Sequence, residues 1–148
     1  MNTKKSVRNI SFKGYGIVLR PVNYNDIMIL RNWRNNPNVR NNLVNKSLIT
    51  EKQQKSWYRK IKERTDQAHW IVWYKGMRAG YVTIKGKGPL ELQNELTGGM
   101  FSGFPKVKHK LLGYAMQMIM LDIAFEHLSI SKFHGPVNKN NSNVRKLL

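Results

Sequence analysis

The chain has 148 residues, of which 41% are hydrophobic, so it is long enough for one folded domain and too short for two. Its 26 Lys and Arg against 8 Asp and Glu give a net charge of +18, which indicates polyanionic partners such as phosphorylated cofactors or nucleic acid. Residues 1–14 are polar and basic and are expected to form a flexible N-terminus. The remaining residues, 15–148, are expected to form a single domain.

Several classes of protein are excluded early. The chain has no Cys, which excludes disulfide frameworks, cysteine nucleophiles and thiolate metal sites and fits a cytoplasmic location. Its four His show no metal-binding spacing, so no metal is expected. The N-terminus lacks the apolar stretch of a signal peptide, and residues 111–128 are too polar for a transmembrane helix, so no membrane association is predicted.

The first half of the domain predicts one strand and two helices. The β-branched run 16–22 predicts a strand. Apolar residues at helical spacing predict a helix from Asn25 or Asp26 to about Asn35, ended by Pro37 and followed by an Asn-rich loop to Asn45. A second helix is expected from Thr50 to about Arg64, because Gln53 can complete a capping box with Thr50.

Three strands are expected next. Residues 69–74 and 79–84 flank Lys75-Gly76, a pair typical of a hairpin turn. A third strand is expected over 95–101, where Gly98-Gly99 would weaken an ordinary strand and therefore predicts a bulge or a close backbone approach.

The strongest helical pattern in the chain covers residues 110–127. Its expected apolar face consists of Leu112, Met116, Ile119, Ile123 and Ala124. A short strand over 132–137 and a helix from Asn141 to Leu148 complete the order β-α-α-β-β-β-α-β-α, a mixed α/β layout.

A phosphate site is indicated just before the long helix. Lys106, Lys108 and Lys110 precede the helix start, where unpaired backbone N–H groups and the helix dipole favour anions. Gly113 would let a ligand approach the backbone closely. The alternative is a solvated basic loop before a core helix.

At this point the chain resembles the GNAT acetyltransferase superfamily. The pyrophosphate loop of that family reads (Gln/Arg)-x-x-Gly-x-(Gly/Ala) and precedes a helix that often carries Ala-Phe-Glu. This chain has Ala-Phe-Glu at residues 124–126. Counting back from that anchor sets Lys108 at the Gln/Arg position, Leu111 at the first Gly and Gly113 at the last position. A second register, Lys110-x-x-Gly113-x-Ala115, matches the glycine but moves the anchor. In both registers Lys replaces Gln or Arg.

Two further segments support the resemblance, which covers residues 16–148. Residues 30–40 resemble the Trp-Arg-Asn…Pro…Arg stretch of enzymes that acetylate nucleotide sugars or ribosomal proteins, and residues 141–147 resemble the last helix of the family. The resemblance implies a GNAT fold, with a mixed and mostly antiparallel sheet flanked by helices. The chain ends before the family's last strands, so the domain is expected to be C-terminally incomplete.

The resemblance also implies site residues. Acetyl-CoA, the expected cosubstrate, would be held by Phe101, Lys106, Lys108, His109, Lys110, Leu111, Leu112, Gly113, Tyr114 and Asn141. The oxyanion would be bound by a backbone N–H near Met100. The acceptor pocket would use Trp33, Arg34, Arg40 and Tyr81.

A catalytic base is sought among few acids. Glu95 is the candidate by its place on the expected fourth strand, with a surface salt bridge as the alternative. His69 and His134 lie on strands that could reach the acceptor cleft, and each is more often structural.

The sequence therefore predicts an enzyme, an acetyl-CoA-dependent N-acetyltransferase that transfers directly to a primary amine in a ternary complex. The preferred acceptor is the 4-amino group of a UDP-linked deoxy-amino sugar. The alternatives are a protein N-terminus of the ribosomal-protein type, or a non-catalytic basic module that binds nucleic acid, which rests on charge alone. A homodimer is compatible with the sequence.

Overall fold

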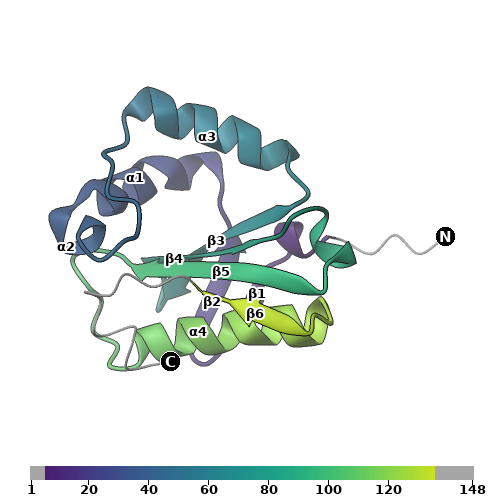
Figure 1. Ribbon diagram of the computed structural model, residues 1–148. Helices are drawn as coiled ribbons and strands as arrows, with labels where there is room; N and C mark the ends of the chain where they lie inside the picture. Colours follow the sequence, from purple (N-terminus) through teal and green to yellow (C-terminus); the bar gives the residue numbers. More distant parts are fainter. Residues whose placement is uncertain (1–5, 136–148) are drawn as a thin grey trace.

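The computed structural model describes residues 6–135, in which helices cover both faces of a six-stranded sheet (Figure 1). The strands are β1 (Phe12–Gly14), β2 (Ile17–Pro21), β3 (Gln67–Tyr74), β4 (Met77–Lys85), β5 (Glu95–Ser102) and β6 (Lys132–His134). They lie side by side in chain order, antiparallel except for the parallel pair β5–β6. The helices are α1 (Ile27–Asn35), α2 (Pro37–Arg40), α3 (Glu51–Glu63) and α4 (Leu112–Asp122). The predicted α/β fold is confirmed.

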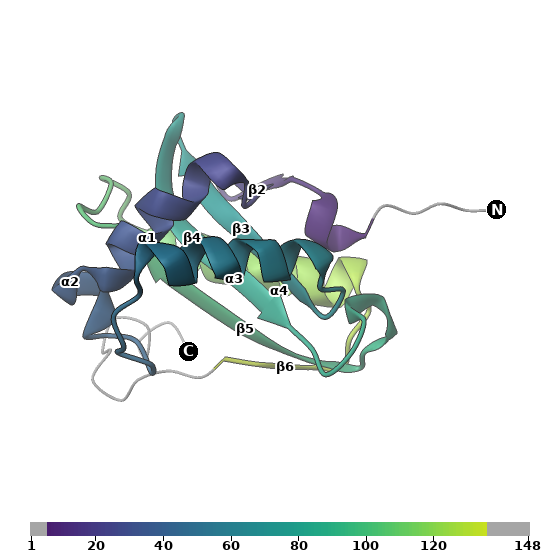
Figure 2. The same ribbon diagram turned by 90° about the horizontal axis from the view of Figure 1, so that it is seen from above.

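The two sheet faces carry different helices. Seen from above, α1 and α3 lie across one face, with α2 beyond the end of α1, whereas α4 lies beneath the opposite face (Figure 2). Glycine positions identify the strand residues that point to each side. Met116 of α4 approaches Gly80, and Met120 approaches Gly98, so the even-numbered residues of β4 and β5 face α4. The odd-numbered residues therefore face α1 and α3.

The N-terminal segment is part of the fold from residue 7 onward, so the expectation of a flexible tail over 1–14 is wrong for this part. Val7 is buried in the larger core cluster, and Trp70 Nε1 donates a 2.9 Å hydrogen bond to the carbonyl of Ile10. Strand β1 pairs with β2 through a turn at Tyr15-Gly16, where both residues have positive φ. Composition suggested a solvated tail, but its few apolar groups are used by the core.

The caps of the first helices explain their boundaries. The capping box of α3 is confirmed, since Thr50 accepts from the backbone N–H of Gln53 and the Gln53 side chain accepts from that of Thr50. The Asn-rich segment expected as a loop contains the short helix α2. Pro37 ends α1 and also starts α2, because proline is favoured in the first turn of a helix, and Asn36 caps it.

The expected hairpin between β3 and β4 is confirmed, with positive φ at Lys75 and Gly76. The expected bulge at Gly98-Gly99 is wrong, because the register of β4 against β5 runs through both residues without a shift. Gly98 is instead a site of close approach by side chains. A Cβ there would lie 2.2 Å from Cζ of Phe133 and 2.7 Å from Sδ of Met120.

The long helix begins at Leu112, two residues later than predicted, and continues after Asp122 as a π-helical turn over Ile123–His127. All five residues of its predicted apolar face are buried. The strand expected over 132–137 is observed as β6, and residues 136–137 and the predicted helix from Asn141 lie outside the described residues.

Candidate functional site

A cavity of about 1130 Å³ extends across the sheet beside β5. Tyr81 and Thr83 line it from the α1–α3 face, whereas Met116 and Met120 line it from the α4 face. Residues 98–103 of β5 and its end form the wall between these two halves. The cavity can therefore admit one ligand from each face and bring the two together at β5.

The edge of β5 that faces this cavity carries backbone polar groups. Strand β6 pairs with residues 95–97 of β5 and does not extend alongside residues 98–102 within the described chain. Gly103 N donates to Ala79 O of β4, which sets the odd-numbered residues of β5 toward β4. Because this direction alternates along a strand, the N–H and C=O groups of Met100 and Ser102, which lie beyond the residues paired with β6, point away from β4 and toward the cavity.

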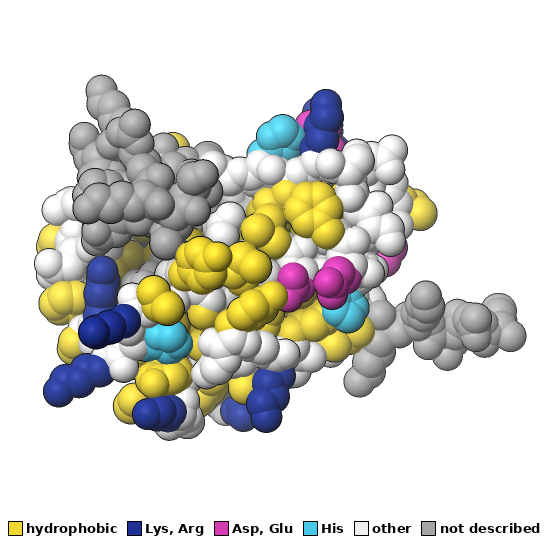
Figure 3. All heavy atoms as spheres, turned by 90° about the horizontal axis from the view of Figure 1, so that it is seen from below, with side chains coloured by type: hydrophobic (Ala, Val, Ile, Leu, Met, Phe, Trp, Pro, Cys, Tyr) yellow, Lys and Arg dark blue, Asp and Glu magenta, His cyan; other side chains and the backbone are white. Residues whose placement is uncertain are grey.

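The start of α4 forms a cationic end of the cavity. The structure gives no acceptor within the described residues to the backbone N–H groups of Gly113 and Tyr114, whereas that of Leu111 donates to His109 Nδ1 at 3.1 Å. Lys106 and Lys110 also line the cavity. Figure 3 views the α4 face and shows Lys and Arg side chains gathered toward one end of it. Free N–H groups, the helix dipole and these two cations together suit a phosphate or pyrophosphate.

The opposite half of the cavity is formed by the segment after α1, held by side chains of α1. Arg34 donates to the carbonyls of Asn45 and Ser47. Asn35 brackets Ile49, since its amide donates to the Ile49 carbonyl at 2.7 Å and its oxygen accepts from the Ile49 N–H at 2.8 Å. Arg34 and Asn35 therefore fix the backbone that forms this wall.

The cavity wall is cationic. No Asp or Glu lines it among the described residues, whereas Arg34, Lys106 and Lys110 do. Burial, followed by repulsion from Arg40, lowers the pKa of Arg34. The Arg40 Nε is buried and has no hydrogen-bond partner in the described chain, and no ion pair there includes either arginine. Two guanidinium groups without a carboxylate favour an anionic ligand.

The structure brings most of the predicted site residues together. Those that line the cavity are Met100, Phe101, Lys106, His109, Lys110, Leu111, Leu112, Gly113, Tyr114, Arg34 and Tyr81. Lys108 and Arg40 lie outside the lining, and Asn141 lies outside the described residues. Trp33 does not line the cavity either. It is 5% exposed and packs with Leu30 and Ile71, so its predicted role in acceptor binding is replaced by a core role.

Glu95 does not lie on the cavity wall, and its environment does not favour a base. Its carboxylate contacts His134 Nε2 at 2.6 Å, and both side chains are 56% exposed. This hydrogen bond lowers the pKa of Glu95, which weakens it as a proton acceptor. The surface salt bridge considered as the alternative is therefore what the structure shows.

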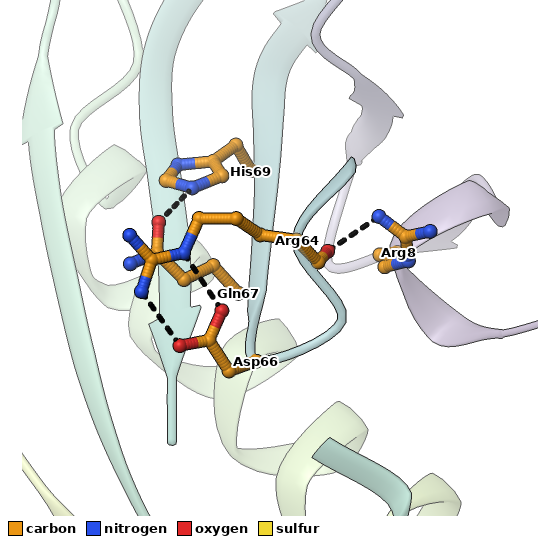
Figure 4. A network of polar contacts seen from close by, with 5 residues as sticks. All are labelled: Arg8, Arg64, Asp66, Gln67 and His69. Carbon is orange, nitrogen blue, oxygen red and sulfur yellow. Dashed lines mark hydrogen bonds and ion pairs between the residues drawn. The ribbon is translucent and has the colours of Figure 1, made fainter. Parts of the chain in front are cut away.

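His69 and Tyr81 were each considered from the sequence, but the buried hydrogen-bond network that joins them behind the cavity was not predicted. His69 on β3 is 5% exposed, and its Nδ1 lies 2.5 Å from the Tyr81 hydroxyl and 3.1 Å from Thr83 Oγ1. Its Nε2 lies 2.9 Å from Oε1 of Gln67 (Figure 4). Burial lowers the pKa of His69 to about 3 and raises that of Tyr81. The alternation of His69, Ile71 and Trp73 along β3 is the sequence signal that could have placed His69 on the α1–α3 face.

No helix among residues 6–135 has the length and apolar character needed to cross a bilayer. No group of three His, Asp or Glu side chains there is arranged to hold a metal ion.

Comparison with solved structures identifies the fold. The spermidine N-acetyltransferase of Vibrio cholerae, solved with CoA and spermine, matches 90% of this chain and 78% of its own at 15% identity and a TM-score of 0.79. A GNAT-family acetyltransferase of Bacillus anthracis matches 93% and 80% at 12% identity and a TM-score of 0.75. AAC(6')-Ib, solved with ribostamycin and coenzyme A, matches 89% and 79% at 15% identity and a TM-score of 0.74.

No family model and no curated protein sequence matches the chain. At identities of 12–15% the similarity to solved structures bears on the fold alone. Together with the order and pairing of its strands, this similarity shows that the chain has the GNAT fold.

Proposed function

We propose that this chain is an acetyl-CoA-dependent N-acetyltransferase that acts on a primary amine, with a UDP-linked 4-amino sugar as the preferred acceptor. The observation that carries the proposal is the cavity that crosses the sheet beside β5. An anion-binding helix start lies on one side of it and a cationic pocket on the other. This arrangement suits a ternary complex, in which two substrates meet without a covalent enzyme intermediate.

The cofactor half follows from the start of α4. The N–H groups of Gly113 and Tyr114, with Lys106 and Lys110, would hold the pyrophosphate of acetyl-CoA. The extended arm of the cofactor would then lie along β5 and accept hydrogen bonds from its free edge. The solved structures of the Vibrio cholerae enzyme and of AAC(6')-Ib with CoA support this choice of cosubstrate.

The backbone N–H of Met100 is the candidate oxyanion donor. It belongs to a residue whose polar groups point away from β4 and toward the cavity. When the amine attacks the thioester, negative charge develops on the carbonyl oxygen, and a fixed N–H donor stabilises that charge without reorganisation. A thioester whose carbonyl does not lie beside the Met100 N–H would lack this stabilisation, so the position of β5 relative to the bound cofactor determines the rate.

The acceptor is inferred to carry negative charge. Arg34 and Arg40 repel each other and meet no carboxylate among the described residues, so a diphosphate bound beside them would relieve the repulsion. The Vibrio cholerae structure contains spermine, a polycation. A wall without acids gives a polycation no ion-pair partner, so we expect this chain to select a different class of amine.

Isothermal titration with acetyl-CoA tests the cofactor half. We expect one site per chain and a loss of affinity of at least tenfold in the double variant Lys106→Glu/Lys110→Glu. The matched control is Lys52→Glu/Lys55→Glu, which makes the same change in net charge on exposed positions of α3. Equal losses in both variants would show that net charge, and not this site, attracts the cofactor.

An acceptor panel tests the second half. Acetyl transfer would be measured with a UDP-linked 4-amino sugar, the same sugar without UDP, spermine and a peptide with a free N-terminus. We expect transfer to the UDP-linked sugar, with an increase in KM when Arg34 is replaced by Met. Preference for spermine would contradict the inferred anionic acceptor, and preference for the peptide would favour protein acetylation.

A further inference from the structure

The chain needs a route for the proton that the acceptor amine loses, and its cavity wall lacks the usual groups. Within the described residues no carboxylate lines the cavity. His109 lines it on the cofactor side, where its Nδ1 already accepts from Leu111 N. On the acceptor side, the imidazole of His69 lies behind the wall and contacts two residues that line it, Tyr81 and Thr83.

His69 also reaches a second cavity. This cavity, of about 230 Å³, is lined by Gln67 and His69 of β3, by Tyr58 and Lys62 of α3 and by Arg8. Tyr81 and Thr83, at one end of the hydrogen-bond network, line the large cavity, whereas His69 and Gln67, at the other end, line the small one. The network therefore connects the two cavities.

The hydrogen bonds of this network have one direction. Thr83 Oγ1 donates to the Ala68 carbonyl, so its proton is not available to His69. His69 Nε2 faces the amide oxygen of Gln67, an acceptor, and therefore carries the ring proton. Nδ1 then has a lone pair and must accept from the Tyr81 hydroxyl. Each proton points from the large cavity toward the small one.

We propose that Tyr81 and His69 form a proton relay from the acceptor amine to the second cavity, an inference that rests on the proposed acetyl transfer. As the amine nitrogen bonds to the acetyl carbon, it gives one proton to the Tyr81 oxygen. The hydroxyl proton of Tyr81 moves to His69 Nδ1, and the Nε2 proton leaves to a water molecule in the second cavity. One proton enters and one leaves to water, so no residue keeps a charge; His69 ends as the Nδ1–H tautomer and must regain the Nε2–H form by proton exchange before the next turnover.

The surroundings of His69 favour a neutral ring that passes a proton on over a stable, protonated imidazolium. The charged groups around it are Lys85 of β4, Arg64 and Asp66 before β3, Lys62 of α3 and Arg8. Arg64 pairs with Asp66 and its carbonyl accepts from Arg8, so little net negative charge is left to hold an imidazolium (Figure 4). A neutral ring with one N–H and one lone pair can accept at one nitrogen while it releases at the other.

Kinetics of two variants test the relay. Tyr81→Phe removes the first hydroxyl, and His69→Gln keeps a polar contact but cannot pass a proton between two ring nitrogens. We expect each to lower kcat by about 100-fold or more while acetyl-CoA affinity stays unchanged. The deficit should persist as pH rises, because even an amine that arrives neutral must lose one proton when it forms the amide. The control is Ile71→Val, a buried residue that pairs with Tyr81 in the sheet and takes no part in the relay.

A second measurement does not depend on activity. The nitrogen chemical shifts of His69 in the labelled wild-type chain should show a neutral Nε2–H tautomer between pH 5 and 8. An Nδ1–H tautomer overturns the relay. Wild-type acetylation with both variants within threefold of Ile71→Val also overturns it and leaves the proposed function intact. A wild-type chain that acetylates no amine in the panel overturns the proposed function together with the relay.

Discussion

Replacing Gly98 with Ala should destabilise the contact between β5, β6 and α4. An added Cβ would lie 2.2 Å from Cζ and 2.6 Å from Cε1 of Phe133, and 2.7 Å from Sδ of Met120. Non-bonded carbon atoms pack at about 3.5–4.0 Å, so the Phe133 ring would have to retreat by about 1 Å or more. Overpacking of this kind costs about 1–3 kcal/mol. For a chain of this length, that corresponds to a decrease in Tm of about 2–12 °C.

Gly99→Ala is the matched control. The nearest atom to its added Cβ is Thr83 Cγ2 at 3.3 Å, a contact that a small shift relieves. Gly98 and Gly99 are absent from the residues with positive φ, so both backbones accept Ala, and both changes restrict the unfolded chain equally. The difference in stability therefore isolates the steric contact.

Urea unfolding and thermal melts of the two variants provide the assay. Phe133→Leu in the Gly98→Ala background should recover part of the loss, since the shorter side chain leaves space for the new methyl group. Equal stabilities of Gly98→Ala and Gly99→Ala would refute the steric reasoning, and a loss that Phe133→Leu does not change would assign the clash to Met120 and not to Phe133.

Three other predictions concern named contacts. Because burial lowers the pKa of His69 to about 3, the folded chain binds fewer protons than the unfolded chain between pH 3 and 6.5. The free energy of unfolding should therefore be highest above pH 6.5 and should fall by up to about 5 kcal/mol toward pH 3. His69→Gln should flatten the pH dependence of the urea midpoint, and an unchanged slope would contradict this. Thr50→Ala removes the cap of α3 and should cost about 0.5–2 kcal/mol, measured by circular dichroism during unfolding, whereas Lys52→Ala should change little. Asn35→Ala removes the two hydrogen bonds of Asn35 to the Ile49 backbone and leaves the bond from Arg31 Nε to the Ile49 carbonyl, so it should speed proteolysis within residues 41–50. Cleavage at the wild-type rate would show that Arg31 and Arg34 hold the segment without Asn35.

Much of the fold was predictable because its signals are local. The cap at Thr50, the turn at Lys75-Gly76 and the apolar face of α4 each depend on residues within a few positions of one another. Strand β1 was missed because a three-residue strand is stabilised by pairing with β2 and by contacts with Trp70, which lies far along the chain. The bulge was expected from glycine composition, whereas the actual reason for Gly98 is the side chain of Phe133.

The same distinction holds for the candidate site. The sequence by itself indicated the proposed anion-binding half, because a helix start and the lysines before it are consecutive in the chain. Tertiary structure decided which residues form the proposed acceptor half. It buried Trp33 in the core, set Glu95 in a surface pair with His134 and left the cavity wall without a carboxylate. Gln67 is two residues from His69 and contacts its Nε2, but only the packing of β3 against β4 brings Tyr81 and Thr83 to Nδ1, because these two partners lie on the neighbouring strand.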